Sequence, residues 1–228
     1  MNIKAGVLFP LVFLLSLPNI FSIELTEKAI EVQLKGEYNQ SLNYHGEMAV
    51  IGDIKLNNLY QLRGGGSVGR SENDIDFNAF LNAAYSPFLT LPLSFSISYI
   101  YNGLPEYKDH THSILPLVSF NNDRAGISLG LNFRFNINPD EDPTFEPIFS
   151  FYGYFNFINM DTLHIGMGIG NYNDFHSKYL RELSLRTYIS LFLGGNWTIS
   201  NEIELMQNWI DSFEFYGFAW RGSVKYSW

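Results

Sequence analysis

Histidine, serine and acidic side chains lie close together in this sequence, and hydrolytic enzymes use these residue types. The candidates are His164 and a cluster of Asp109, His110, His112 and Ser113. A hydrolase needs a nucleophile, a base and an orienting group that converge in space. The spacing shows no such convergence, and no serine lies in a recognisable nucleophile motif. We therefore assign no catalytic residue and keep hydrolysis as the third functional hypothesis.

A glycine-rich stretch formally fits a nucleotide-binding pattern. Gly64, Gly66 and Gly69 match G-x-G-x-x-G, but that motif binds phosphates only between a strand and a following helix. No helical pattern follows. The stretch, flanked by Arg63 and Arg70, is therefore interpreted as a flexible outer loop, and no cofactor is predicted.

An acidic stretch could attract a divalent cation through its carboxylate oxygens. Asp140, Glu141, Asp142 and Glu146 lie among prolines, and their spacing is not that of a calcium-binding loop. A solvated acidic loop is the preferred interpretation, and no metal site is predicted. The chain has no cysteine, which excludes disulfides, thiol catalysis and cysteine-based metal sites.

The composition indicates that water does not cover the whole surface. Only 16% of the 228 residues are charged, while 46% are hydrophobic and 17% aromatic. A soluble domain usually carries about 25% charged residues. The net charge of −9 argues against nucleic acid as a partner, because phosphate binding requires concentrated Lys and Arg.

The N-terminus has the organisation of a secretory signal. Lys4 precedes an apolar run, Ala5–Leu17, and the small residue Ser22 follows. A transmembrane helix needs about 20 apolar residues, so this run is interpreted as the hydrophobic region of a cleavable Sec signal. Cleavage after Ser22 gives a signal peptide over 1–22 and a single exported domain over 23–228.

Alternation of apolar and polar residues runs through the remaining chain. The clearest case is 124–136, where six apolar residues alternate with small and polar ones. A period of two is the pattern of a β-strand with one apolar and one polar face. No segment has convincing helical periodicity, so the predicted fold class is all-β. The pattern recurs at 30–38, 91–101, 163–170 and 183–193.

Longer polar connections and short turns alternate between these strands. The longer set is 39–43, 64–74, 102–112, 137–144, 171–181 and 208–212, and the shorter set is 52–53, 87–90, 122–123, 158–161 and 199–200. Bacterial transmembrane barrels have longer outer loops, short periplasmic turns and an even strand number. Six loops and five turns give twelve strands. Ten is the alternative, because 44–62 could be one bent strand and Pro116 lies inside a weak one.

The C-terminal segment alternates up to an aromatic last residue. Its apolar face and its glycine comprise Tyr216, Phe218, Trp220, Gly222, Val224, Tyr226 and Trp228. This end, the leader and the strand rhythm resemble the bacterial outer-membrane β-barrel family, whose last strand is recognised by the barrel-assembly machinery. Gly222 lies one residue away from the usual position of the glycine in that signal.

The resemblance implies a single antiparallel β-barrel in the outer membrane of a bacterium with a double-membrane envelope. Closure is physically required there, because each backbone polar group within a bilayer needs an internal partner. Apolar side chains would then face outer-membrane lipid, and polar ones would face the interior. A soluble β-sandwich is the alternative.

The polar faces of the strands predict which residues line the lumen. They are Glu31, Lys35, Glu37, Lys55, Arg134, His164, Arg186, Glu202, Glu204, Arg221 and Lys225. Charges along a water-filled lumen select solutes, whereas the same charges paired across a narrow lumen close it. The leading hypothesis is a small porin-like channel for passive diffusion of small hydrophilic solutes. The second is a closed barrel that presents its outer loops to a partner, and the third is a membrane-embedded hydrolase.

Overall fold

The computed structural model describes most of the chain after its N-terminal segment. The described ranges are 25–39, 43–57, 59–71, 74–88, 91–104, 109–176, 182–208 and 214–228. The predicted signal peptide lies outside them, and its cleavage stays a prediction. The described ranges include no helix that is long and apolar enough to cross a membrane.

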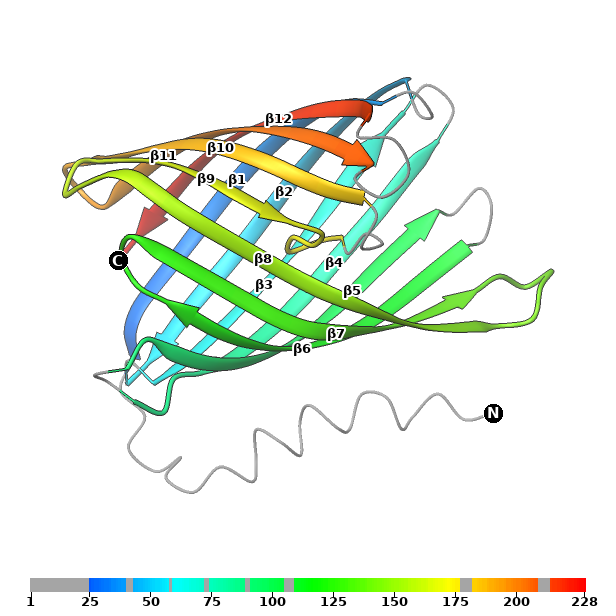
Figure 1. Cartoon of the computed structure of the whole chain (residues 1–228), viewed down its shortest axis with the longest axis horizontal. Coiled ribbons are helices and arrows are strands. Elements are labelled where there is room, and N and C mark those ends of the chain that lie inside the picture. The colour runs from blue at the N-terminus through cyan, green and yellow to red at the C-terminus, as the bar shows by residue number, and fades with distance from the viewer. Residues whose placement is uncertain are drawn as a thin grey trace.

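Twelve strands form one closed barrel (Figure 1). They are β1 (Leu25–Asn39), β2 (Asn43–Leu56), β3 (Tyr60–Arg70), β4 (Ile75–Tyr85), β5 (Leu93–Leu104), β6 (Asp109–Asn121), β7 (Ala125–Ile137), β8 (Thr144–Met160), β9 (Leu163–Gly170), β10 (Glu182–Leu193), β11 (Trp197–Asn208) and β12 (Glu214–Ser227). Consecutive strands pair, and β1 pairs with β12. The predicted all-β barrel of twelve strands is confirmed, and the alternative of ten is wrong.

The terminal strands close the ring in register. β1 and β12 pair from Ala29 opposite Ser227 to Asn39 opposite Gly217. Lys28 and Trp228 add two backbone hydrogen bonds of 3.0 and 2.9 Å. This pairing satisfies backbone groups that an open sheet edge would expose to lipid. The end of the barrel with these termini is called the turn end below, and the opposite end is called the loop end.

Several predicted connections lie inside strands. The predicted turns at 52–53 and 199–200 are wrong, because β2 and β11 pass through them. The chain reverses before β11 at Gly195 and Asn196, whose φ angles of 82° and 69° are left-handed values that favour glycine and asparagine. The predicted flexible loop at 64–74 is also wrong, since its residues up to Arg70 belong to β3.

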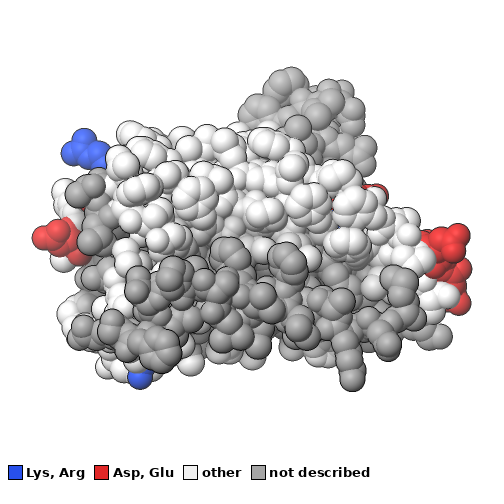
Figure 2. All heavy atoms as spheres, turned by 90° about the horizontal axis from the view of Figure 1, so that it is seen from below, with Lys and Arg blue, Asp and Glu red and all other residues white. Residues whose placement is uncertain are grey.

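The outer surface of the barrel is apolar. Ile30, Val32 and Leu34 on β1 are 46%, 44% and 51% exposed, although large apolar side chains are usually buried in soluble proteins. On the face seen in Figure 2, the described residues over the middle are uncharged, and charged side chains lie towards the ends. An apolar band between polar ends is the surface that a membrane barrel presents to lipid.

The interior has two chemically different sides. Ser150, Ser184 and Glu204 are buried polar residues on β8, β10 and β11. On β2, β4, β5 and β6, by contrast, inward side chains form an apolar cluster that comprises Ala49, Ile51, Phe80, Ile100, Leu115 and Leu117, together with Phe175 from a loop. This part of the lumen, called the apolar side below, thus contains an apolar cluster, and buried polar side chains such as Glu47, Asn78 and Ser98 lie on the same strands.

Candidate functional site in the barrel lumen

The connection between β9 and β10 enters the barrel. Its described part, Asn171–His176, is called the lumen loop. The sequence predicts an outer loop over 171–181, but Asn173 and neighbouring residues line cavities inside the barrel. In the ring of strands, β3 lies halfway around from β9. The lumen loop contacts Arg63 on β3 and Phe80 on β4, so it crosses the lumen.

Two asparagines shape the lumen loop. Asn171 continues the pairing with β8, because its backbone N–H donates to the Phe151 carbonyl (3.1 Å) and its side chain donates to the Phe149 carbonyl (2.8 Å). Asn173 Oδ1 accepts hydrogen bonds from the N–H groups of Phe175 and His176 at 2.9 and 2.8 Å. This Asx turn folds the chain into a compact tip.

Three contacts fix the tip to the opposite wall. Asp174 Oδ2 lies 2.9 Å from a guanidinium nitrogen of Arg63 on β3. The Phe175 ring meets the Phe80 ring on β4 edge to face, with centroids 4.9 Å apart. The Phe175 carbonyl accepts a hydrogen bond of 2.7 Å from Asn102 Nδ2 on β5. An ion pair, an aromatic contact and a hydrogen bond thus anchor one short loop.

A polar cavity of about 460 Å³, called the chamber below, lies between the lumen loop and the wall that includes β1, β10, β11 and β12. Three arginines, three carboxylates and three tyrosines line it: Arg63, Arg186, Arg221, Glu31, Asp174, Glu202, Tyr152, Tyr172 and Tyr188. Serine and amide side chains complete the lining. Small-molecule sites commonly measure about 300–1,000 Å³, so the chamber has room for a small solute.

Two of the chamber arginines form ion pairs with chamber carboxylates. Arg221 lies 2.6 Å from Glu202. Arg63 lies 3.4 Å from Glu31, in addition to its contact with Asp174. Both guanidinium groups are only partly exposed, which keeps these pairs stronger than ion pairs in open water.

The third chamber arginine is almost completely buried. Arg186 is 5% exposed and lies 3.8 Å from Glu204, which is 3% exposed. Arg186 also donates a hydrogen bond of 3.0 Å to the Tyr172 carbonyl of the lumen loop. Its guanidinium carbon lies 5.1 Å from the centre of the Tyr152 ring, within the range of a cation–π contact. Arg186 therefore links the wall to the near side of the lumen loop.

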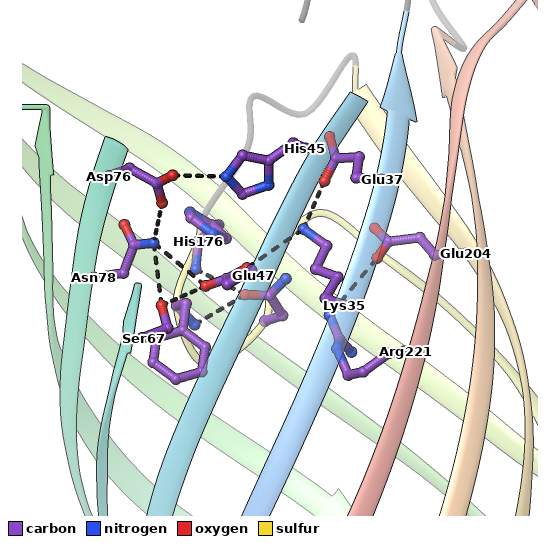
Figure 3. A network of polar contacts seen from close by, with 12 residues as sticks. Lys35, Glu37, His45, Glu47, Ser67, Asp76, Asn78, His176, Glu204 and Arg221 are labelled. Atoms are coloured by element: carbon purple, nitrogen blue, oxygen red, sulfur yellow. Dashed lines mark hydrogen bonds and ion pairs between the residues drawn. The ribbon is translucent and has the colours of Figure 1, made fainter. Parts of the chain in front are cut away.

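Towards the loop end, the lumen narrows to a network of charged and polar side chains (Figure 3). Lys35 Nζ lies 2.6 Å from Glu37 and 3.9 Å from Glu47. Glu47 also accepts a hydrogen bond from the Ser67 hydroxyl. A second cavity, lined by Lys35, Glu47, Arg221 and the tip of the lumen loop, has a volume of only about 10 Å³. This is roughly the space that one water molecule needs, so little space remains between these described side chains and the tip of the lumen loop, and this part of the lumen is called the constriction below.

The structure places most of the predicted lumen-lining residues in the chamber or in the network. Chamber residues are Glu31, Arg186, Glu202 and Arg221, and network residues are Lys35, Glu37 and Glu204. Closer to the turn end, Lys55 lies 2.6 Å from Glu27, and Lys225 lies 3.9 Å from Asp53.

Arg134 and His164 lie on other parts of the inner wall. Arg134 is opposite Glu146 in the β7–β8 register. The His164 ring meets the Phe192 ring edge to face, with centroids 4.6 Å apart. Any role of either residue in solute passage stays a prediction.

Sequence patterns do not identify several residues that shape the chamber. Arg63 is predicted to flank a flexible loop, and this is wrong because it lies within β3. Tyr152 lies on β8, which has aromatic residues on both faces, and Tyr188 lies on β10 among apolar and polar residues, so the pattern does not mark either of them. Tyr172 and Asp174 lie in a connection, whose path depends on contacts with distant strands.

The terminal strand presents apolar side chains outward. Of the residues predicted for this face, Phe218, Trp220, Val224 and Trp228 are exposed. Tyr216 is less exposed than these residues. The β11–β12 register shifts beside it, because Met206 pairs with Gly217 whereas Gln207 pairs with Phe215. Such a bulge reorients neighbouring side chains. The proposed recognition of this strand during assembly stays a prediction.

The first histidine cluster is engaged with tyrosines. His112 Nδ1 lies 2.7 Å from the Tyr99 hydroxyl, and His110 Nδ1 lies 2.9 Å from the Tyr101 hydroxyl. Ser113 is buried. Within the described ranges, no group of three or more His, Asp and Glu residues could hold a metal ion.

His164 lies among residue types that a hydrolase could use. It is opposite Ser190 in the β9–β10 register and opposite Asn159 in the β8–β9 register. The Ser190 hydroxyl, however, forms a hydrogen bond of 2.8 Å with Ser200. The register therefore brings together a serine, a histidine and an amide, with the serine hydroxyl directed to another serine.

Comparison with known proteins finds similar folds among solved structures but no match to the sequence. No protein-family model matches the sequence, and a search of curated proteins found no match. Among solved structures, the KdgM porin in complex with disordered oligogalacturonate matches 88% of this chain and 99% of its own, with a TM-score of 0.59 and 12% identity. The NanC porin matches 86% and 98%, with a TM-score of 0.58 and 9% identity. The outer membrane phospholipase dimer from Salmonella typhi, with bound calcium, matches 95% and 96%, with a TM-score of 0.50 and 8% identity.

At these identities the likeness concerns the fold. The chain folds as a closed twelve-stranded β-barrel with the architecture of these porins. Porins and a phospholipase share this architecture, so the activity has to be argued from the site and not from the fold.

Proposed function

We propose that this protein is a narrow outer-membrane channel through which small hydrophilic solutes diffuse passively. The observation that carries the proposal is the polar chamber of about 460 Å³ inside a closed barrel. Fixed charges and hydrogen-bonding groups along such a space determine which solutes enter. The apolar outer band supports contact with outer-membrane lipid. Export through the Sec pathway and insertion by the barrel-assembly machinery belong to the same proposal.

The network towards the loop end makes the channel narrow. Its cavity of about 10 Å³ has room for about one water molecule, so a solute passes only when the lumen loop or nearby side chains move. The proposal therefore expects a small conductance and a sensitivity to changes in the lumen loop.

Single-channel recording in a planar bilayer tests the proposal. Protein purified from outer membranes, shown to be a heat-modifiable barrel, is expected to give small, stable, ohmic current steps. Arg134→Ala and Arg186→Ala are expected to change conductance or ion preference. If both variants keep both properties, the lining assignment is wrong, and a folded barrel without any conductance contradicts the channel itself.

A closed barrel that presents its outer loops to a partner is the alternative. The constriction favours it, because paired charges such as Lys35 and Glu37 can close a narrow lumen. The β7–β8 connection at the loop end, with exposed Asp140, Glu141 and Asp142, is the best candidate for a contact surface. Deletion of 139–142 would abolish partner binding under this alternative while the barrel stays inserted. Conductance together with a deletion variant that still binds would contradict it.

A hydrolase is a further candidate because the register brings Ser190, His164 and Asn159 to neighbouring strands. This hypothesis expects hydrolysis of an ester or phospholipid substrate by the purified barrel. It also expects Ser190→Ala to abolish that hydrolysis while Ser200→Ala retains part of it. Absence of hydrolysis in the unmodified protein, with the barrel folded, contradicts this hypothesis.

A further inference from the structure

The chamber differs from a general water-filled pore in its balance of charge. Its lining has three arginines, Arg63, Arg186 and Arg221, and three carboxylates, Glu31, Asp174 and Glu202. Their formal charges sum to zero, although the whole chain has a net charge of −9. A solute in the chamber therefore meets no excess of either sign.

The chamber arginines all lie close to carboxylates. Arg221 and Glu202 are 2.6 Å apart, Arg63 is 2.9 Å from Asp174, and Arg186 is 3.8 Å from Glu204 of the neighbouring network. A charged solute that enters gives up water, but finds a counterion that already has a partner. Desolvation of an ion without a free counterion is costly, so the chamber disfavours both anions and cations.

Hydroxyl groups suit this lining better than ions do. A guanidinium group has five N–H donors and a carboxylate has about four acceptor sites, so an ion pair leaves donors and acceptors side by side. A hydroxyl can accept from the arginine and donate to the carboxylate at the same time.

Aromatic rings supply the remaining contact. Tyr152, Tyr172 and Tyr188 line the chamber, and the Tyr152 and Tyr172 rings meet edge to face with centroids 6.3 Å apart. A tyrosine combines a flat apolar surface with a polar tip. The C–H face of a sugar ring can pack on such a surface while its hydroxyls reach the polar groups.

We propose that the chamber is a binding site for an uncharged, polyhydroxylated solute, of the chemical class of small neutral sugars. The proposal rests on the channel function and names the solute class that this channel prefers. The volume of about 460 Å³ limits the bound solute to about one or two sugar rings, since sites of about 300–1,000 Å³ hold small ligands.

Liposome swelling with three probes of one ring size tests this preference. Glucose, glucuronate and glucosamine differ mainly in charge, and ionic current from the same preparation shows whether the channel conducts. Glucose is expected to enter about fivefold faster than either charged sugar, because the charged forms lose more hydration. Glucose is also expected to reduce the ionic current in a saturable manner.

Glu202→Gln is the sharpest variant. Among the described carboxylates, it leaves Arg221 with its more distant neighbour, Glu204 at 3.9 Å, and it gives the chamber lining one positive charge in excess. The ratio of glucuronate to glucose entry is expected to rise about fivefold. Arg221 becomes available to pair with the glucuronate carboxylate, and such a pair contributes about 1 kcal/mol. The matched control is Glu27→Gln, which removes a carboxylate paired with Lys55 and is expected to leave the ratio unchanged.

The outcomes separate the two proposals. Ionic current with faster entry of glucuronate or glucosamine than glucose overturns the neutral-sugar site but leaves the channel. Current with equal entry of all three probes, and no saturable effect of glucose, overturns the site as well. Absence of both current and swelling with a folded barrel overturns the channel function itself.

Discussion

Asp174 of the lumen loop lies 2.9 Å from Arg63 on the opposite wall of the barrel. A loop between β9 and β10 therefore reaches β3, which is halfway around the ring. The ion pair fixes the position of the tip and places a carboxylate in the chamber. Electrostatic and steric roles of the lumen loop can be separated, because the neighbouring Phe175 makes the apolar contact.

Asp174→Asn is expected to shift ion preference towards anions with little change in conductance. The substitution removes one negative charge from the chamber, and a partly exposed ion pair contributes only about 0–1 kcal/mol to stability. Reversal potentials under a salt gradient measure the shift, which should weaken at high salt because charges are screened. Asp123→Asn, in the exposed β6–β7 turn, is the control. An equal shift in both variants would contradict the role of Asp174.

Phe175→Ala is expected to have the opposite effect, a larger conductance with little change in ion preference. Phe175 is 6% exposed and packs on Phe80. Loss of a buried phenylalanine contact costs about 3 kcal/mol, which changes the docked population of the loop by about a hundredfold. Single-channel recording measures the change.

The matched control is Phe157→Ala, since Phe157 is 57% exposed on the outer surface. This variant is expected to conduct like the unmodified protein. Unchanged conductance in Phe175→Ala would show that the lumen loop does not limit passage.

Alternation of residue type predicted the strands because each strand has one face towards lipid and one towards the interior. The segment 124–136 corresponds closely to β7 (Ala125–Ile137). The glycine-rich segment was misinterpreted for the same physical reason: residues 64–66 have no side chains that reveal alternation, so β3 and the inward position of Arg63 are hidden. The predicted turn at 199–200 is wrong because β11 continues through polar residues such as Ser200 and Asn201.

The chamber could be predicted only in part. The polar positions of alternating strands predict Glu31, Arg186, Glu202 and Arg221 correctly as residues of the lumen wall. The lumen loop was not predicted, since its path depends on long-range contacts with Arg63, Phe80 and Asn102. The apolar side of the lumen was also hidden, because residues 114–118 are apolar without alternation.

Arg186→Ala is expected to destabilise the barrel. It removes the guanidinium group that lies 3.8 Å from Glu204, a carboxylate that is only 3% exposed. Removal of one partner from a buried ion pair costs about 3–5 kcal/mol. Denaturant unfolding of the refolded barrel, followed by tryptophan fluorescence, measures this loss.

The double variant Arg186→Ala with Glu204→Ala separates a buried charge from lost packing. It is expected to recover part of the stability, since the buried carboxylate that lost its Arg186 neighbour is then removed as well. The control is Lys55→Ala, whose ion pair is exposed and should contribute about 0–1 kcal/mol. If the double variant is less stable than Arg186→Ala, the lost stability comes from lost packing and not from a buried charge.

Trp228→Ala is expected to lower the amount of folded barrel in the outer membrane several-fold. The Trp228 side chain is 55% exposed, whereas its backbone N–H and carbonyl bond to Lys28. Because those backbone bonds do not need the indole, the purified variant should refold in detergent like the unmodified protein. A defect only in cells therefore indicates recognition by the assembly machinery. Trp197→Ala, another exposed tryptophan at the turn end, should assemble normally. An equal defect in both variants, or a refolding defect in Trp228→Ala, would instead assign the residue a role in barrel stability.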